Sequence, residues 1–425
     1  MSAPSDVKGR LPGSGRAVVA GAGVVGVCSA LYLQREGWNV TLVDPDGPGE
    51  GCSFGNAGLL ADTAVVPVAT PDILASVPKM LLDPMAPLAI RWSYLPKLAP
   101  WLLRFLAASR PSRVEEISQA LATICARVFE DFQPLIADAG AQDLVQRRGY
   151  LGAYRNPAKL AGMRWELALK RSRGMKAEEL GPEELRQLEP ALARDVVGGY
   201  FLPGCGHTVN PLALTQRFVA AFERLGGTVR RARVVDFTDF GEDGPRAVVT
   251  DGGQLLCDLV VIAAGAYSRT LAARLGADVP LDTERGYHTV IADPGIQLRL
   301  PLMCGDGSFG ITPMATGLRL AGTVELGGTE AAPNHRRLEP MRAHAKALLP
   351  GLKVEGGTQW MGRRPSMPDS LPVIGRSPQH RNVLLAFGHG HLGLTLSAPT
   401  GRQIADLASE RTPAIDVTPF RPERF

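Results

Sequence analysis

The chain contains 425 residues, of which 45% are hydrophobic and 21% are charged. This composition is that of a packed globular protein, and the length predicts two or more domains. The net charge of +4 is small and the basic residues are scattered, which excludes a basic nucleic-acid-binding surface. The six cysteines lie far apart without a C-x-x-C pair, so we expect reduced thiols in a cytoplasmic protein and neither disulfides nor zinc.

A glycine-rich turn near the start of the chain has the pattern of a dinucleotide-binding loop. An apolar strand predicted over residues 17–20 leads into Gly21-Ala22-Gly23-Val24-Val25-Gly26, which opens a helix expected to end at residue 36. The first glycine permits a tight turn, the second lets the backbone approach a pyrophosphate, and the third lets the helix pack on the strand. The helix N-terminus then faces the phosphates with its free N–H groups.

The next predicted strand, residues 39–43, supports the same interpretation. It ends at Asp44, where a carboxylate accepts hydrogen bonds from an adenosine ribose, and Pro45 beside it is a further predicted cofactor contact. The alternative is an ordinary strand–helix–strand crossover. Residues 17–34 carry no charge and imitate a signal or membrane segment, but the three glycines in phosphate-loop register argue against one.

A second glycine-rich turn stands near the other end of the chain. An apolar strand predicted over 383–387 leads into Gly388-His389-Gly390-His391-Leu392-Gly393, and a helix is expected over 394–408. Two such turns indicate a flavin cofactor, because the far end of a long dinucleotide must be met by a distant part of the chain. The two histidines supply only two metal ligands with no carboxylate beside them, so we predict no metal site.

Two other segments of small residues would let the backbone approach a ligand closely. One is the loop 49–60, which contains Ser53 and the run Asn56-Ala57-Gly58-Leu59. The other is the turn Ala264-Gly265 after a buried strand. The loop 49–60 is open to the alternative of a plain surface loop.

Helix and strand patterns alternate at both ends of the chain and differ in the middle. We predict helices and strands over these ranges: 114–139, 157–173, 211–225 and 334–349 as helices, and 150–154, 228–240, 246–263 and the alternating stretch 286–323 as strands. The fold class is therefore α/β, with a Rossmann-like FAD-binding domain built from discontinuous segments and an α+β substrate domain with a mainly antiparallel sheet. The predicted FAD-binding segments are 1–70, 197–275 and 355–425, and the predicted substrate segments are 71–196 and 276–354.

The stretch 70–110 combines apolar and tryptophan residues with repeated prolines and a few basic residues. Prolines forbid one long helix, so we expect several short ones. Two interpretations stay open: a helical lid or packing element, and a segment that lies in a membrane interface.

Three side chains are candidates for substrate chemistry. Arg364, in Gly362-Arg363-Arg364-Pro365, follows an apolar strand, where a guanidinium can grip a carboxylate through two parallel hydrogen bonds. Tyr287 and His288 lie in a strand pattern, and Tyr287 would share that carboxylate. The alternatives are a structural ion pair for the arginine and an edge tyrosine in the sheet.

At this point the chain resembles the bacterial FAD-dependent D-amino-acid dehydrogenases of the D-amino-acid oxidase and glycine oxidase superfamily, over essentially its full length. The motifs that carry the resemblance are Ser53…Asn56-Ala57-Gly58, Trp360-Met361-Gly362-Arg363-Arg364-Pro365, Pro368-Asp369, Pro372-Val373-Ile374-Gly375, Gly388-His389-Gly390…Gly393…Thr395 and the tail Arg411-Thr412-Pro413-Ala414-Ile415.

The resemblance implies a role for several residues. Arg364 matches the arginine that binds the substrate carboxylate, and Tyr287 matches a tyrosine in a Lys-Gly-Tyr-like segment, although Arg285 replaces the lysine here. The flavin contacts that it implies are Gly362, the turn from Gly388 through Leu394 to Thr395, the backbone of Val234 at the adenine, and Ala264 and Gly265. Arg285 and Gly206-His207-Thr208-Val209-Asn210-Pro211 look closer to relatives that act on cyclic D-amino acids such as cis-4-hydroxy-D-proline.

The expected activity is oxidative deamination of a D-amino acid by hydride transfer from Cα to N5 of non-covalently bound FAD. His288 is a candidate acceptor of the amine proton. The alternatives are a sarcosine- or glycine-type secondary-amine oxidase and a flavin-bound subunit without turnover of its own. Quinone, an electron-transfer protein and oxygen stay open as electron acceptors, and the stretch 70–110 leaves open peripheral contact with the inner face of the membrane.

Overall fold

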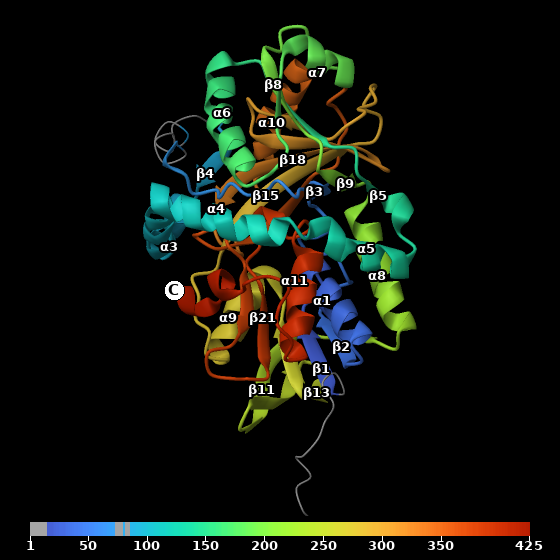
Figure 1. Ribbon diagram of the computed structural model, residues 1–425, viewed down its shortest axis with the longest axis vertical. Helices are drawn as coiled ribbons and strands as arrows, with labels where there is room; N and C mark the ends of the chain where they lie inside the picture. Colours follow the sequence, from blue (N-terminus) through green and yellow to red (C-terminus); the bar gives the residue numbers. More distant parts are fainter. Residues whose placement is uncertain (1–14, 73–79, 81–85) are drawn as a thin grey trace, which may run out of the picture.

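The computed structural model describes residues 15–72, 80 and 86–425. Figure 1 shows two parts stacked along the long axis, a lower part around β1 (Arg16–Ala20) and β21 (Val383–Phe387) and an upper part around β15 (Asp282–Ile291) and β18 (Gly317–Leu326). Helix α4 (Pro111–Cys125) runs across the middle of the view, between the two parts. Strands β1 and β21 belong to the same lower sheet although they come from opposite ends of the chain, so the lower part is assembled from separated segments.

The lower part is built on a six-stranded sheet that is parallel except at one edge, where β20 runs antiparallel to β21. In spatial order its strands are β10 (Thr228–Arg231), β2 (Asn39–Asp44), β1 (Arg16–Ala20), β14 (Leu259–Ile262), β21 (Val383–Phe387) and β20 (Val373–Arg376). Successive side chains of β1 enter different cores, because a strand buried on both faces points its side chains alternately to each. Val19 belongs to one core and Val18 to the other.

Helices cover one face of this sheet, and a small antiparallel meander covers the other. The first layer contains α1 (Val24–Arg35), α5 (Val128–Ala139), α8 (Pro211–Arg224) and α11 (Ser397–Ala408), together with α4. The second layer contains β11 (Val234–Gly241), β12 (Gly244–Thr250), β13 (Gly253–Leu256) and the short helix α9 (Ser268–Arg274). Both layers bury apolar faces against the sheet, so the strand ends are held rigidly.

The upper part is a large, mainly antiparallel sheet. Its strand order is β19 (Trp360–Ser366), β15 (Asp282–Ile291), β18 (Gly317–Leu326), β17 (Phe309–Met314), β16 (Leu302–Cys304), β6 (Tyr150–Tyr154), β8 (Gly198–Leu202) and β7 (Glu178–Leu180), and β4 (Leu88–Ile90) also pairs with β18. Apolar side chains of α7 (Pro182–Leu188) and α10 (Leu338–Leu348) pack on one face of this sheet. The opposite face looks toward the lower part (Figure 1).

Short elements connect the two sheets. A three-stranded sheet joins β3 (Leu59–Leu60), β9 (Gly206–Thr208) and β5 (Val145–Gln146), and α3 (Leu95–Ala108) and α6 (Pro157–Ser172) lie at the edges of the upper part. The predicted fold class, a parallel cofactor sheet with a mainly antiparallel second domain, is confirmed.

The strands place two segments differently from the predicted domain boundaries. Strand β8 falls in the predicted FAD-binding segment 197–275, and β19 falls in 355–425, yet both belong to the upper sheet. Conversely, α4 and α5 fall in the predicted substrate segment and pack in the core of the lower part. The predicted domain boundaries differ from this sheet membership because the pairing of distant strands decides which sheet a strand joins, and local sequence patterns do not encode that pairing.

Three predicted elements are divided in the structure. The helix expected over 114–139 is two helices, because the chain turns at Ala126 and Arg127 before α5 packs against α11 and α8. The strand expected over 228–240 is β10 and β11, and the strand over 246–263 is β12, β13 and β14. Short turns within each of these apolar stretches let the chain leave one sheet and enter another.

Helices α1 and α11 follow the two glycine-rich turns and pack directly against each other. At their closest approach a Cβ on Gly401 would lie only 2.7 Å from the backbone of Cys28, so only glycine fits at position 401. Cys28 and Ile404 are fully buried in the same core. Because each helix begins just after its turn, this contact fixes the distance between the two turns.

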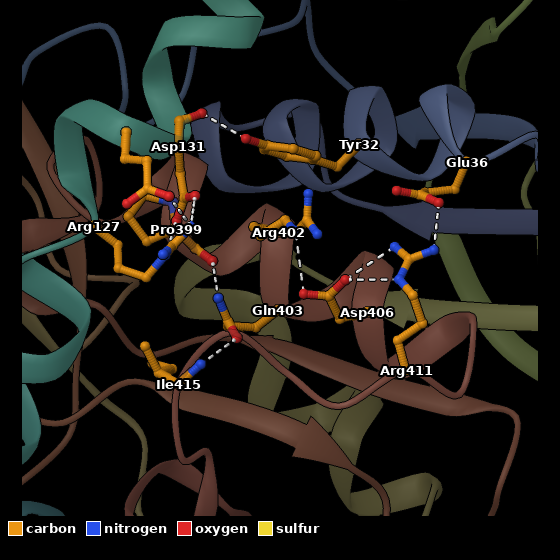
Figure 2. Close-up of polar contacts among 11 residues, drawn as sticks. Tyr32, Glu36, Arg127, Asp131, Pro399, Arg402, Gln403, Asp406, Arg411 and Ile415 are labelled. Carbon is orange, nitrogen blue, oxygen red and sulfur yellow. Dashed lines mark hydrogen bonds and ion pairs between the residues drawn. The ribbon is translucent and has the colours of Figure 1, made fainter.

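Polar contacts reinforce the same packing (Figure 2). The Asp406 carboxylate at the end of α11 is buried and accepts hydrogen bonds from Arg402 Nε at 3.1 Å and from Arg411 Nη2 at 2.9 Å. Arg411 also pairs with Glu36, the residue that ends α1. The buried carboxylate therefore ties the C-terminal end of α11 to the C-terminal end of α1.

Replacing Asp406 by asparagine should lower the free energy of unfolding by about 2–3 kcal/mol, because charged hydrogen bonds from two arginines to a buried carboxylate are lost. Urea unfolding followed by circular dichroism measures the change. The matched control is Glu410→Gln, which removes an exposed ion pair with Arg381 and should change stability by less than about 0.5 kcal/mol. Equal effects of the two variants would contradict a structural role for Asp406.

Candidate active site

A cavity of about 1450 Å³ lies between the two parts. Most of the predicted site residues line it, and they come from both glycine turns and from the segments between them: Gly21, Gly23, Val24, Val25, Asp44, Pro45, Ser53, Asn56, Ala57, Leu59, Val234, Ala264, Gly265, Tyr287, Gly362, Arg364, His389, Gly390, His391, Leu392, Gly393, Leu394 and Thr395. Four predicted residues do not line it: Gly26, Gly58, Gly388 and His288. The folded chain thus brings both glycine turns to one continuous cavity.

Each glycine of the first turn meets a different steric demand. Gly21 has a φ of +109°, and a Cβ there would lie 2.4 Å from the carbonyl oxygen of Ala263. A Cβ on Gly26 would lie 1.9 Å from the carbonyl oxygen of Gly21. A Cβ on Gly23 would meet only the Ser53 hydroxyl at 3.4 Å, so Gly23 leaves open the space that a phosphate group needs.

Asp44 stands at the end of β2 and braces the first turn. Its carboxylate accepts hydrogen bonds from the Ala22 N–H at 2.7 Å and from the Asp46 N–H at 2.9 Å. Burial raises the pKa of Asp44, although these two N–H groups lower it. The carboxylate also lines the cavity, where a ribose hydroxyl would reach it.

The loop 49–60 is ordered by hydrogen bonds to both parts of the molecule. The Ser53 hydroxyl accepts a hydrogen bond from the Val24 N–H at 2.9 Å, at the N-terminus of α1. Asn56 folds the loop back on itself by donating to the Ser53 carbonyl oxygen and accepting from the Gly58 N–H. Arg319 of β18 donates to the Asn56 carbonyl oxygen at 2.7 Å, and burial lowers the pKa of Arg319 to about 10. The alternative of a plain surface loop is therefore wrong.

The second turn has a left-handed backbone at Gly388 and Gly390, with φ values of +82° and +54°. His389 is buried, its Nε2 lies 2.9 Å from the Thr400 hydroxyl, and burial lowers its pKa to about 3. It is therefore a neutral structural residue. Thr395 donates to the Leu59 carbonyl oxygen at 3.0 Å, which joins this turn to the loop 49–60.

Helix α11 begins at Ser397 and not at residue 394 as predicted. A short 3₁₀ turn, Gly390–Leu392, comes first and places His391 in the cavity. Burial, with smaller contributions from the Arg364 and Lys170 charges, lowers the pKa of His391. Both histidines of the turn therefore line the cavity, and the His389 ring is also held by Thr400. Within the described ranges, no group of three histidine, cysteine or acidic side chains could hold a metal ion.

A bulge in the upper sheet positions Arg364. The pairing of β15 with β18 shifts between Arg285 and Tyr287, and Thr323 in the bulge has a φ of +59°. The carbonyl oxygens of Thr323 and Gly322 accept hydrogen bonds from the Arg364 guanidinium at 2.9 and 3.3 Å. Bulges often re-aim side chains in this way beside active sites.

A glycine next to the bulge completes the seat of the guanidinium. A Cβ on Gly286 would lie 2.2 Å from Arg364 Cζ, so the guanidinium lies flat across this glycine. Its remaining N–H groups are free to bind a carboxylate in the cavity.

Tyr287 is among the residues that line the cavity, but its side chain points to the other face of the sheet, which argues against the predicted partnership with Arg364. Neighbouring residues of a strand face opposite ways, so Tyr287 turns away from the face that Gly286 shares with Arg364. Its hydroxyl donates to the Glu325 carboxylate and accepts from the Asn334 N–H at 2.9 Å. Arg285 is fully buried on that same side and pairs with Glu325 at 3.3 Å.

His288 is buried behind the cavity wall. Its Nδ1 lies 2.9 Å from the Gly55 carbonyl oxygen, and its ring stacks on Trp360 with centroids 4.8 Å apart. Burial lowers the pKa of His288 to about 4. His288 is not among the residues that line the cavity, which argues against its predicted role as acceptor of the amine proton.

Several cavity residues were missed by the sequence reasoning. Glu284, a buried carboxylate, stands directly opposite Arg364 in the pairing of β15 with β19. Beyond His391 the cavity reaches Tyr150, Glu166 and Lys170, and burial raises the pKa of Glu166 and lowers that of Lys170. The only sequence signal for Glu284 was an acidic residue inside a strand pattern. Glu166 and Lys170 are four residues apart in a predicted helix, a spacing typical of an exposed ion pair on a helix surface, so they were not recognised as cavity residues.

The comparisons with known proteins agree with this geometry. Two glycine turns and an arginine around one cavity define a flavin-dependent oxidoreductase, and a family model described as "FAD dependent oxidoreductase" matches residues 16–407. The chain therefore belongs to this family of FAD-dependent oxidoreductases, which is called DAO, and its cofactor is FAD, as the sequence predicted.

Two relatives match nearly the whole chain. A D-amino-acid oxidase of Bradyrhizobium diazoefficiens is 39% identical over 98% of this chain and 100% of its own length. A D-amino acid dehydrogenase of Paramagnetospirillum magneticum is 33% identical over 96% of this chain and 99% of its own length.

Solved structures share the fold at lower identity. Glycine oxidase from Geobacillus kaustophilus gives a TM-score of 0.72 at 23% identity, and covers 97% of this chain and 100% of that one. L-proline dehydrogenase from P. horikoshii gives a TM-score of 0.73 at 19% identity and covers 98% of both chains. At these identities the likeness shows the fold alone.

The three glycines of the first turn allow a direct test of cofactor binding. Gly23→Ala should leave the stability of the FAD-free protein nearly unchanged and weaken FAD binding at least about tenfold, because its Cβ enters the phosphate space. Gly26→Ala should instead destabilise the FAD-free protein by at least about 1–3 kcal/mol through overpacking. Fluorescence titration with FAD and thermal unfolding of both variants measure the two effects. Normal FAD affinity in a folded Gly23→Ala protein would rule out this placement of the pyrophosphate.

Proposed function

We propose that this protein oxidises D-amino acids to 2-oxo acids with FAD as the first electron acceptor. The observation that carries the proposal is Arg364, a cavity-facing guanidinium whose seat is built by Gly286 and the bulge at Thr323. A fixed arginine of this kind suits an α-carboxylate. The names of the two similar full-length relatives, an oxidase and a dehydrogenase of D-amino acids, support the substrate class.

The chain positions the reactants, and FAD, when bound, supplies the acceptor for a hydride at N5. Gly23, the α1 N-terminus and Asp44 would hold the pyrophosphate and ribose, while Ala57 and the turn from His389 to Thr395 would hold the ring end. Arg364 binds the substrate carboxylate and so presents the Cα hydrogen to the ring. Loss of a hydride from Cα gives an imino acid, which water hydrolyses to a 2-oxo acid and ammonia.

A cyclic substrate such as D-proline or cis-4-hydroxy-D-proline would give a cyclic imine by the same step. The residues behind this substrate idea, Arg285 and the segment from Gly206 to Pro211, do not line the cavity. Any preference for cyclic substrates therefore acts through the shape of the cavity and not through direct contact with these residues.

Anaerobic titration of the flavin absorption near 450 nm tests the proposal. D-proline, cis-4-hydroxy-D-proline and D-alanine should bleach the band, and their L-forms should not. Bleaching by sarcosine or glycine alone would favour the secondary-amine oxidase, and a yellow protein that no amine bleaches would favour a flavin-bound subunit without turnover.

Arg364→Ala should lower kcat/KM by about 30- to 1000-fold, which corresponds to about 2–4 kcal/mol of lost transition-state binding. Arg364→Lys keeps the charge but cannot form the bidentate contact, so its kcat/KM should lie between that of the unaltered protein and that of Arg364→Ala. The neighbour Arg363, whose Nε donates to the Thr329 carbonyl oxygen, is the control position. A loss below about fivefold for Arg364→Ala would contradict its role, as would a larger loss for Arg363→Ala.

A second proposal concerns the electron acceptor. One end of the cavity is lined by apolar residues of β4 and α3, among them Ile90, Trp101 and Phe105. In the same segment Trp92, which also lines the cavity, and Leu103 are 67% and 68% exposed. An apolar outer surface beside an apolar passage suits peripheral binding to a membrane and reoxidation by a quinone. No helix among the described residues is long and apolar enough to cross a membrane.

Leu103→Glu should weaken co-sedimentation with anionic lipid vesicles at least about fivefold, because an apolar contact is replaced by a repelled charge. Turnover with a soluble dye should not change. Leu256→Glu, at a 56% exposed leucine on the distant meander, is the control and should bind vesicles normally. Vesicle binding that is absent in the unaltered protein, or insensitive to Leu103→Glu, would refute the membrane proposal.

A further inference from the structure

Two opposite charges stand side by side on the cavity face of the upper sheet. Glu284 on β15 pairs in register with Arg364 on β19, and directly opposed residues of this kind carry their Cβ atoms about 4.5–5.5 Å apart. Both side chains line the cavity. Glu284 is only 8% exposed, so its carboxylate is withdrawn from bulk water.

The two charges attract each other without forming an ion pair in contact. The Arg364 guanidinium leans away across Gly286 and donates to the carbonyl oxygens of Thr323 and Gly322. Among the described residues, no ion pair joins it to Glu284. Burial still outweighs the stabilisation that Arg364 and Ser366 give the Glu284 carboxylate, so this site gains free energy when a ligand brings a positive charge to Glu284.

The groups around Glu284 come from its own strand and from the neighbouring strand. Asp282 lies two residues earlier on the same face and bonds to the Tyr94 hydroxyl at 3.1 Å. Ser366 and Arg364 face Glu284 from β19, while Arg285 points to the opposite side of the sheet. Burial raises the pKa of Glu284 and Asp282 adds to the rise, whereas Arg364 and Ser366 oppose it.

We propose that Glu284 binds the ammonium group of the substrate and accepts one of its protons, while Arg364 binds the α-carboxylate. This inference rests on the proposed oxidation of amino acids. An α-amino acid is a zwitterion whose two charged groups are separated by a single carbon atom. Adjacent residues of opposite charge on neighbouring strands match that spacing, and a fixed pair would also select which hydrogen faces the flavin.

The step is balanced within the site. One N–H bond of the ammonium breaks, an O–H bond forms on Glu284, and the electron pair stays on nitrogen. That pair then forms the C=N bond as the Cα–H bond breaks and its two electrons leave with the hydrogen to FAD. A carboxylate of raised pKa is a stronger base than an ordinary glutamate, so burial favours the proton transfer.

The pH dependence follows from the direction of that pKa. Glu284 must be ionised to accept a proton, and its pKa lies above the ordinary value, so kcat/KM should fall as the pH drops through this raised pKa. His389 is neutral throughout the neutral range. Glu284→Gln should remove this acidic limb of the profile, which a merely structural substitution would not do.

The test compares ligands with and without an amine, at pH 7, in holoenzyme with normal FAD content. Glu284→Gln should weaken binding of D-proline and D-alanine and slow flavin reduction by at least tenfold. Binding of pyrrole-2-carboxylate and propanoate, which keep the carboxylate and lack a basic amine, should change by less than twofold. Glu284→Asp should recover part of the lost rate. The control Glu166→Gln, another carboxylate in the same cavity, should leave the ratio between the two ligand classes unchanged.

The outcomes separate this inference from the proposed function. If D-amino acids do not reduce the unaltered protein, the proposed function falls and the role of Glu284 falls with it. If they reduce the unaltered protein and Glu284→Gln equally well, only the role of Glu284 is overturned. Loss of FAD from both Glu284→Gln and Glu284→Asp would assign the carboxylate to the cofactor and would also overturn it.

Discussion

The close packing of α1 against α11 is the constraint on which the rest of the site depends. A dinucleotide of fixed length must meet one glycine turn at each end, so the turns need a fixed separation. The contact at Gly401 and Cys28 sets that separation, because no side chain keeps the two backbones apart there. The buried Asp406 carboxylate then holds the far ends of the helices together. Because the cofactor site is rigid, the side chains of the upper sheet that line the same cavity have a fixed position relative to it.

The upper sheet divides its polar residues between its two faces. On the cavity face Glu284 and Arg364 stand side by side without a hydrogen-bonded ion pair, whereas on the other face Arg285, Tyr287 and Glu325 form a buried cluster. The Tyr287–Glu325 hydrogen bond and the Arg285–Glu325 ion pair link β15 to β18 beside the bulge, although Nε and Nη1 of Arg285 have no hydrogen-bond partner. The charged groups that face the cavity are therefore carried on strands that a buried polar cluster holds together.

Local sequence patterns predicted the parts of the site that depend on local chemistry. The glycines of both turns, Asp44 and Arg364 are set by steric and charge demands within short segments, and the structure places Asp44 and Arg364 at the cavity. The face that a strand residue occupies depends on register with distant strands, and the bulge at Thr323 alters that register. For this reason the sequence did not reveal that the Tyr287 side chain points to the opposite face or that Glu284 stands opposite Arg364, whereas His288 shares a face with Glu284 and is covered by the loop 49–60.

The walls of the cavity beyond the cofactor turns differ in polarity, and this difference constrains which molecules reach the flavin. Lys170 and Glu166 make part of the lining polar, while Trp101 and Phe105 make another part apolar. A zwitterion loses hydration when it passes along apolar walls, and a hydrophobic electron acceptor is not stabilised by charged ones. The Arg364–Glu284 pair lies near the apolar part, since the Trp101 indole donates to the Ser366 carbonyl oxygen on the same strand as Arg364. Once a zwitterion is bound, its charges are neutralised by this pair in surroundings of low dielectric, where each contact is strongest.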